Sequence, residues 1–480
     1  MVSVFGVALL IPLLGPLVAR ADRGPEPTRD GAAARAVTDL VGDPAMKDLD
    51  LGVAVRCTAD RALWGAHQAD QKLSPASGAK LLSTAAVLET FALDHTFATV
   101  VRGQKVGAVV EDLTLVGGGD PASTAADLGR LADRLKELGV ERVRGGVGVD
   151  LGRFAGSATP PAYDRKKTDA AYRPEVPSLG ITFGALVVTV RPAKKVGDPV
   201  RVTTSLTAPS IVIDNRATTV AGKASDKLEV AVAAGAGGVT RVVVSGALGD
   251  KAQAIGLKKR VTDPARVAAE VFVQALSARK IKVEGGLRAG GSTAGRAVLT
   301  ELARVESRPV ADLVRETNTT SNNYMAETLF KQLGVDPATN SATWERAQSA
   351  TTAALTRLGL EARAFEIVNG SGLYEGTKVS ASAMTSLLAI ESKDDAKAKA
   401  FRASLAVAGE SGTLKNRLKS LKGKVRAKTG TLDDALSLSG YVPAARCLLA
   451  FSVLVNGDIG DRAPKVISGI DTFVTALAKL

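Results

Sequence analysis

The feature that most constrains the fold of this 480-residue chain is a change of pattern between its middle and its ends. Residues 103–300 hold short β-rich runs separated by Gly, Pro, Asp and Asn, which is typical of a mainly β region. Helix-like stretches at 125–138 and 264–278 bracket its centre. On either side the pattern is mixed: Leu51–Cys57 predicts a strand and Pro464–Leu480 predicts a helix. We therefore expect one α/β domain interrupted by a long insertion, since the chain exceeds a single ordinary core.

The first residues have the composition of an export signal. Met1–Leu17 is apolar or small, and Ala19–Ala21 matches an A-x-A cleavage site, although no Lys or Arg precedes the apolar run. Residues 22–36 are rich in Pro, Gly, Ala and charge, which predicts a flexible linker. We expect a signal peptide over 1–21 and an exported protein of the periplasm or cell envelope, its first segment either cleaved or kept as an anchor.

The formal charge of +13 favours anionic surroundings. No Lys/Arg block is interleaved with aromatic residues, so nucleic acid is not an expected partner. The cations are spread along the chain, which indicates a basic solvated surface and leaves association with wall polyanions or a membrane surface open. The two histidines and two cysteines do not suggest a metal site, and no cofactor is expected. The number of histidines does not exclude a Ser-His-Asp triad, but neither His67 nor His95 has a suggestive setting, so a hydrolase here would need a base other than histidine.

Pro75–Lys80 (PASGAK) opens a helix that the apolar pattern predicts over about residues 77–93. A spacing of three places Ser77 and Lys80 on one helix face. Serine becomes a nucleophile when a base accepts its proton, and lysine is such a base once burial or another cation destabilises its ammonium. By itself S-x-x-K is weak, and Ser77 could equally be an ordinary serine at a helix start. The pattern recurs at Ser277–Lys280, at the end of a charged helix, where we expect only a solvated face.

Two further short motifs follow in order. Ser321–Asn323 (SNN) precedes a helical pattern, and its hydroxyl and carboxamide can flank a site from a loop, although such residues are also common helix caps. Lys428–Thr431 (KTGT) stands just before a strand predicted over Leu436–Val442. A strand edge with a lysine, two hydroxyls and the unencumbered backbone of Gly430 suits an extended peptide that ends in a carboxylate, although a basic turn has the same composition.

The three motifs together are more specific than any one of them. Their order, their helix and strand context and their spacing agree with the S-x-x-K, S-x-N and K-T-G elements of penicillin-recognising serine enzymes. From about Leu40 onward the chain resembles the S13 D-Ala-D-Ala carboxypeptidases, the class C low-molecular-mass penicillin-binding proteins. Asn322 and Asn369 stand where that family more often has Asp. The segments that carry the resemblance are Leu73–Leu81 (LSPASGAKL), Leu115–Pro121 (LVGGGDP), Ser321–Glu327 (SNNYMAE), Asn369–Leu373 (NGSGL) and Ala408–Leu414 (AGESGTL).

The resemblance implies an α/β fold class: a β-lactamase/transpeptidase-like domain, with an antiparallel sheet flanked by helices, interrupted by two inserted, mainly β domains. It implies peptidoglycan stem peptides as substrates, β-lactam antibiotics as covalent inhibitors, and no metal or cofactor. The expected divisions are a transpeptidase-like domain at 37–100 and 301–480, inserted domain II at 101–180 and 256–300, and inserted β domain III at 181–255.

The resemblance also assigns roles to the motif residues. Ser77 would be the acylated nucleophile, Lys80 its general base, and Ser321 the group that passes the proton to the leaving D-alanine. Asn323 would hold the substrate backbone, and Lys428 would supply positive potential. Thr429 and Thr431, on either side of Gly430, would bind the terminal carboxylate, with the N–H groups of Ser77 and Thr431 as the oxyanion hole.

In the implied fold the first and last strands are antiparallel neighbours. Cys57 ends the first strand and Cys447 begins the last, so we expect the two cysteines to meet. Two states are open, a disulfide in an oxidising compartment or two buried free thiols.

Three functions remain to be compared. The first is a D-Ala-D-Ala carboxypeptidase that also acts as an endopeptidase on cross-links. The second is a serine β-lactamase, which needs fast deacylation; no acidic residue is clearly placed for that step, and the long insertion argues against it. The third is a non-catalytic wall-binding scaffold of the same fold, which would tolerate loss of the motif side chains. Because all of them are present, we expect an enzyme.

Overall fold

The computed structural model describes residues 31–225, 227–288, 299–374 and 376–480. The signal peptide predicted for residues 1–21 and the first part of the predicted linker lie outside these residues. Within the described ranges, no helix combines the length and the apolar character needed to cross a membrane.

The linker prediction is wrong for residues 31–36, because Gly31–Val41 forms helix α1. Alanine is the best helix former, and four small or apolar residues recur at positions i, i+3, i+4 and i+7. These residues are buried: Ala33, Ala36, Val37 and Leu40. They pack α1 on strand β2 (Leu63–His67) and helix α10 (Ala463–Leu477), so a long-range contact stabilises a segment whose composition is typical of a linker.

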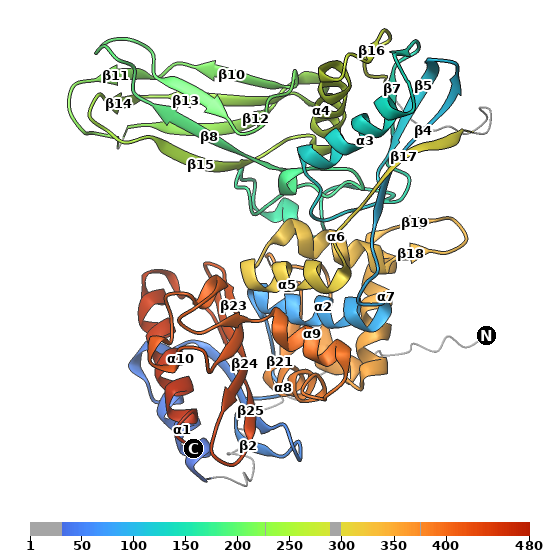
Figure 1. Ribbon diagram of the computed structural model, residues 1–480. Helices are drawn as coiled ribbons and strands as arrows, with labels where there is room; N and C mark the ends of the chain where they lie inside the picture. Colours follow the sequence, from blue (N-terminus) through green and yellow to red (C-terminus); the bar gives the residue numbers. More distant parts are fainter. Residues whose placement is uncertain (1–30, 226, 289–298, 375) are drawn as a thin grey trace, which may run out of the picture.

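A six-stranded antiparallel sheet forms the base of the molecule, with strand order β2-β1-β25-β24-β23-β22. In Figure 1 its blue and red strands lie side by side, because the two ends of the chain meet in it. Strands β1 and β25 pair along their whole length, from Asp50↔Asn456 to Cys57↔Leu449, which confirms the predicted neighbours. Besides β2, the strands are β1 (Asp50–Cys57), β22 (Ala406–Val407), β23 (Arg426–Thr431), β24 (Ala435–Pro443) and β25 (Leu448–Asn456).

Helices cover both faces of this sheet, which explains why β24 and β25 are buried almost throughout, including Ser437, Ser439 and Ser452. Helices α1 and α10 cover one face and α8 covers the other, backed by a helical cluster around α2. The predicted antiparallel sheet flanked by helices is therefore confirmed. The remaining helices of this main body are α2 (Ala79–Thr90), α5 (Val310–Thr320), α6 (Asn323–Leu333), α7 (Trp344–Leu358), α8 (Ala381–Ile390) and α9 (Ala396–Ser404). Its short strands are β3 (Lys72–Leu73), β18 (Val335–Asp336), β19 (Ser341–Ala342), β20 (Phe365–Glu366) and β21 (Lys378–Ser380).

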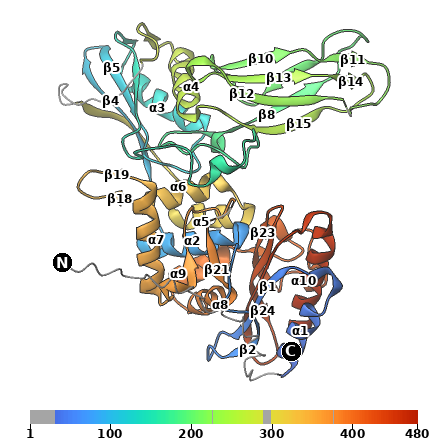
Figure 2. The same ribbon diagram turned by 180° about the vertical axis from the view of Figure 1, so that it is seen from behind.

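Between α2 and α5 the chain builds two further bodies, which project from the main body in Figures 1 and 2. The first has a mixed sheet of order β16-β6-β5-β4-β17, with β7 paired to β5, and two packed helices. Its elements are β4 (Ala98–Val106), β5 (Val109–Val116), α3 (Ala125–Glu137), β6 (Arg142–Val143), β7 (Val147–Asp150), α4 (Pro264–Ala278), β16 (Lys282–Val283) and β17 (Thr300–Glu306).

The second inserted body consists of strands and short turns. Its strands are β8 (Ala185–Arg191), β9 (Arg201–Thr204), β10 (Ile211–Asn215), β11 (Thr218–Val220), β12 (Glu229–Ala234), β13 (Thr240–Ser245), β14 (Ala247–Gly249) and β15 (Ile255–Arg260). Apolar residues of both inserted bodies share one buried cluster, from Leu128 on α3 to Val188 on β8. The domain boundaries at 101, 181 and 256 therefore stay a proposal.

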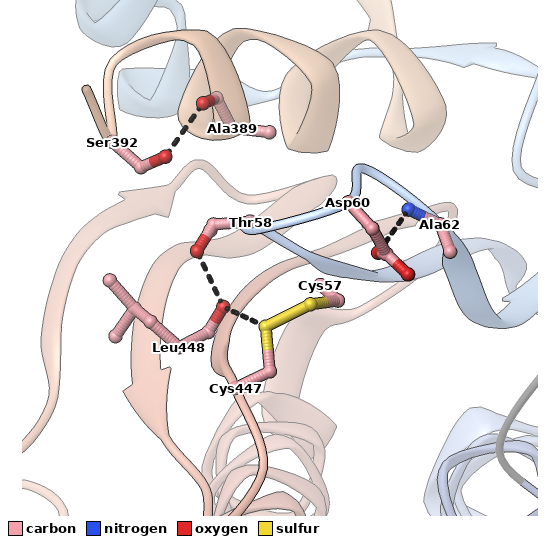
Figure 3. Close-up of a disulfide and its surroundings, with 8 residues drawn as sticks. All are labelled: Cys57, Thr58, Asp60, Ala62, Ala389, Ser392, Cys447 and Leu448. Atoms are coloured by element: carbon pink, nitrogen blue, oxygen red, sulfur yellow. Dashed lines mark hydrogen bonds between the residues drawn. A yellow bond between two sulfur atoms is a disulfide. The ribbon is translucent and has the colours of Figure 1, made fainter.

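The structure has a disulfide between Cys57 and Cys447, one of the two states left open by the sequence (Figure 3). Cys57 ends β1, Cys447 directly precedes β25, and their Cα atoms are 5.8 Å apart. The backbone N–H of Thr58 donates to the carbonyl oxygen of Leu448 at 3.0 Å, so the ladder continues one residue beyond the cysteine. The bond therefore joins strand ends that the sheet has already paired.

We expect the double variant Cys57→Ala/Cys447→Ala to lose about 2 to 4 kcal/mol of unfolding free energy, since the cross-link restricts the unfolded chain over a sequence separation of 390 residues. Denaturant unfolding of the oxidised wild type, the reduced wild type and the variant measures this loss. The reduced wild type should resemble the variant. Equal stability of all three proteins would contradict the prediction.

Candidate active site

Ser77 lies in a single 3₁₀ turn, Ala76–Gly78, directly before α2. Ala76 has a φ of 46°, a left-handed conformation that costs energy in a residue with a side chain. The α-helix itself covers Ala79–Thr90, so the predicted helix over 77–93 is too long at both ends. At its C-terminal end, Phe91 is extended, with φ −103° and ψ 154°. The strained turn presents Ser77 at the helix start, partly exposed, while the next residues are buried.

Lys80 lies one turn after Ser77 and is fully buried. Its Nζ is 2.9 Å from Ser77 Oγ, 2.7 Å from Asn323 Oδ1 and 3.0 Å from the carbonyl oxygen of Ser371. Burial lowers the pKa of Lys80 to about 7, against the opposing field of Glu327. A neutral amine is then accessible near neutral pH, so Lys80 can accept the proton of Ser77.

The second motif lies at the junction of two helices. Ser321 ends α5 in the left-handed conformation, with φ 58°, and Asn322 caps α6 by accepting from the N–H of Met325. Asn323 Oδ1 accepts from Lys80, while its Nδ2 donates to the backbone oxygen of Tyr172 at 2.7 Å. The amide nitrogen expected to hold the substrate is therefore bound to the loop between β7 and β8, in the inserted region.

The third motif lies within strand β23 rather than in a turn. Lys428 is fully buried, and its Nζ donates to Ser321 Oγ at 2.9 Å and to the backbone oxygen of Thr429 at 2.7 Å. Burial and the neighbouring charge of Lys80 hold the pKa of Lys428 well below its usual value. Thr429 Oγ1 donates to Thr413 Oγ1 at 2.8 Å, and Thr431 is exposed at the strand end. Motif residues of three distant segments thus meet through Lys80 and Lys428.

The glycine of the third motif allows β23 to approach the turn that carries Ser77. A Cβ atom at Gly430 would lie 2.3 Å from the backbone oxygen of Pro75 and 2.3 Å from Ser437 Oγ. Ser437 Oγ itself donates to Pro75 at 2.6 Å. A side chain at position 430 would therefore push β23 away from the nucleophile.

The outer edge of β23 is open beside these residues. Strand β22 pairs only with its first part, at Val407↔Arg426 and Ala406↔Ala427. In the described part of the chain no strand follows along Lys428–Thr431 on that side. An extended peptide can therefore add to this edge through main-chain hydrogen bonds.

Four residues at the site had no assigned role from the sequence: Tyr163, Tyr172, Glu327 and Ser371. Glu327 carried a usable signal, because it lies four positions after Asn323 and a helix places such residues on one face. Tyr163 and Tyr172 lie in the inserted region, and no local pattern connects them with the motifs. The residues of this site come from both ends of the chain and from its inserted region. Their grouping is consistent with the roles proposed for the motif residues.

Most of the chain resembles known proteins in sequence and in fold. The profile of the D-Ala-D-Ala carboxypeptidase 3 (S13) family matches residues 33–477. The chain is 31% identical over 456 residues to a D-alanyl-D-alanine carboxypeptidase of Actinomadura sp. (strain R39), covering 92% of this chain and 83% of the relative. Its fold matches penicillin binding protein 4 (dacB) of Haemophilus influenzae, with TM-score 0.80, 21% identity, and 92% and 99% of the two chains covered. A second structure of that protein, complexed with a β-lactam, matches with TM-score 0.75, 22% identity, and the same 92% and 99% coverage.

Proposed function

Because this chain belongs to the D-Ala-D-Ala carboxypeptidase 3 (S13) family, we propose that it is a serine-type D-Ala-D-Ala carboxypeptidase acting on peptidoglycan stem peptides through an acyl-enzyme on Ser77. The observation that carries the mechanism is the contact between Lys80 Nζ and Ser77 Oγ at 2.9 Å, with Lys80 buried. A buried amine with a pKa of about 7 is a base at physiological pH.

In the acylation step the stem peptide lies along the open edge of β23, with its carboxylate at Thr429 and Thr431. Lys80 takes the proton of Ser77, and Ser77 Oγ attacks the carbonyl carbon of the penultimate D-alanine. The N–H groups of Ser77 and Thr431 stabilise the oxyanion. The C–N bond then breaks, and Ser321, hydrogen-bonded to Lys428, relays the proton of Ser77: it accepts that proton from Lys80 and gives its own to the amine of the leaving D-alanine, which leaves Lys80 neutral again.

In the second step Lys80 takes a proton from a water molecule that attacks the ester at Ser77, and it gives this proton to Oγ as the shortened peptide leaves. The same chemistry cleaves a cross-link when the leaving amine belongs to a second stem, and we include this endopeptidase activity in the proposal. A β-lactam resembles the D-Ala-D-Ala terminus and acylates the same serine, but its ring-opened leaving group stays attached, so we propose that penicillins inhibit the enzyme.

The test measures D-alanine release from an acyl-D-Ala-D-Ala peptide and covalent penicillin labelling, with the adduct mapped by peptide mass. We expect release, and an adduct on Ser77 that is lost slowly. Rapid turnover of penicillin would favour a β-lactamase. A folded protein with neither activity would favour the wall-binding scaffold of the same fold. Export to the periplasm or cell envelope belongs to the same proposal, because the proposed substrate lies there.

We also propose that the chain associates with wall polyanions through one face of the second inserted body. Arg191 on β8 lies directly opposite Arg201 on β9, and Lys258 on β15 points to the same side by the alternation of the sheet. All three residues are exposed, and within the described ranges none forms a salt bridge. Strands β8, β9 and β15 contain no Asp or Glu. Like charges directly opposite each other are unfavourable, and a bound polyanion would relieve the repulsion.

The variant Arg191→Ser/Arg201→Ser/Lys258→Ser should bind linear poly(glycerol phosphate) more weakly, with a smaller loss of affinity as salt rises, because fewer counterions are released. The matched control Lys47→Ser/Lys465→Ser/Lys479→Ser removes the same charge from exposed positions of the main body. Titration at several salt concentrations measures both variants. Equal weakening by the two variants, or binding of wild type only to anionic phosphatidylglycerol vesicles, would contradict the proposal.

A further inference from the structure

Glu327 is a buried carboxyl group that the proposed mechanism does not use. It lies on α6 with no exposed surface. Oε2 accepts the N–H of Gly370 at 3.0 Å, and Oε1 accepts the N–H of Ser371 at 2.8 Å and the hydroxyl of Tyr163 at 3.3 Å. Burying a carboxyl group is costly unless donors satisfy it, and here three donors converge.

The two amides bound by Glu327 belong to the loop Asn369–Leu373, which packs against the nucleophile. The carbonyl oxygen of Ser371 accepts from Lys80 Nζ at 3.0 Å. A Cβ atom at Gly372 would lie only 1.9 Å from the backbone oxygen of Ala76, the residue before Ser77. The carboxylate therefore holds the backbone that fixes one of the three contacts of Lys80 Nζ.

Glu327 is also the carboxylate whose field acts on Lys80. It raises the pKa of Lys80, while burial lowers it more strongly. The other groups that face this pair are Tyr163, from the loop between β7 and β8, and Lys428 from β23, whose pKa is lowered by burial and by the charge of Lys80. Lys331, on the same helix as Glu327, donates to the backbone oxygen of Ser157 and lies over the ring of Trp344. Burial raises the pKa of Glu327, and its hydrogen bonds to Ser371 and Gly370 oppose that shift.

We propose that Glu327 is a positioning residue for acylation of Ser77: it clamps the Gly370–Ser371 backbone that fixes Lys80, and its negative charge favours the ammonium form of Lys80. The inference rests on the proposed function, because it assumes that Lys80 activates Ser77. It adds a role for the Asn369–Leu373 segment, which the catalytic steps leave without one.

The test is the pH dependence of the second-order rate constant for acylation by penicillin. Glu327→Gln keeps the side-chain volume, removes the charge, and turns an NH₂ group toward a backbone N–H. Without the carboxylate the pKa of Lys80 falls, so the acid limb of the profile should move to lower pH by about one unit. The lost clamp should lower the plateau rate about tenfold or more, since small displacements at a reacting centre are costly.

Glu327→Asp separates the two roles. It keeps the charge but is one methylene too short to reach both amides, so the plateau should fall while the acid limb stays in place. The matched control is Glu270→Gln, which alters another buried carboxylate, on α4, that accepts a backbone N–H from Ser210. This control should leave both the limb and the plateau unchanged.

Each outcome decides one part of the inference. An unmoved limb in a folded Glu327→Gln overturns the role of the charge, and a wild-type plateau in Glu327→Asp overturns the clamp. If Glu327→Gln does not fold, the Asp variant still tests the clamp, and a wild-type plateau there overturns the inference. A wild type that is neither acylated nor active would instead overturn the proposed function, so the two failures are distinguishable.

Discussion

Replacing Ser77 by alanine should abolish covalent labelling by penicillin and lower D-alanine release by about 10³-fold or more. The hydroxyl is partly exposed and lies 2.9 Å from Lys80 Nζ. Removing it leaves the binding surface of β23 intact but no atom to form the ester. Binding of the peptide should therefore change little while turnover is lost.

The sequence itself supplies a control for this variant. Ser277 begins the second S-x-x-K pattern, at the end of α4, where Ser277 and Lys280 are exposed as predicted. Ser277→Ala should keep wild-type labelling and turnover. Intact mass and peptide mapping after exposure to penicillin distinguish the two variants. An adduct that persists in Ser77→Ala would show that the nucleophile is another residue.

Replacing Lys80 by methionine should lower the acylation rate by about 10²- to 10⁴-fold, which is the usual effect of losing a general base. Methionine has a similar volume, so the buried site should stay filled. In the wild type the acylation rate should rise with pH through about 7, because Lys80 is a base only when neutral and its pKa is about 7. In Lys80→Met this acid limb should disappear.

The measurement is the rate constant for penicillin acylation between pH 5 and 9, on folded protein at constant ionic strength. Lys280→Met, in the exposed copy of the pattern, is the matched control and should keep the wild-type profile. A Lys80→Met variant that retains an acid limb near pH 7 would assign that titration to a different group.

Much of the main body could be predicted from the sequence, because its elements have strong local signals. The apolar runs at Leu436–Val442 and Leu448–Asn456 correspond to β24 and β25, and the helical spacing at the C-terminus corresponds to α10. The pairing of β1 with β25 followed from the family resemblance, and with it the meeting of Cys57 and Cys447.

Local patterns failed where a distant contact decides the structure. Residues 31–36 have the composition of a linker, yet they are helical because β2 and α10 cover their small apolar face. The contact of Asn323 with the backbone of Tyr172 had no signal, since a carbonyl oxygen from an inserted body leaves no trace in residue type. Glu327 was visible as part of a motif, but its role depends on a loop more than forty residues away.

The sequence alone determined which chemical groups this protein brings to its site: a serine, two lysines, a second serine and an asparagine, in an order that indicates their family. Tertiary structure alone decided that they meet. The pKa of Lys80 falls to about 7 because its amine is buried, in contact with the turn before α2, with α6 and with the loop after β20. Desolvation depends on packing from all sides, and no short stretch of sequence contains the segments that provide it.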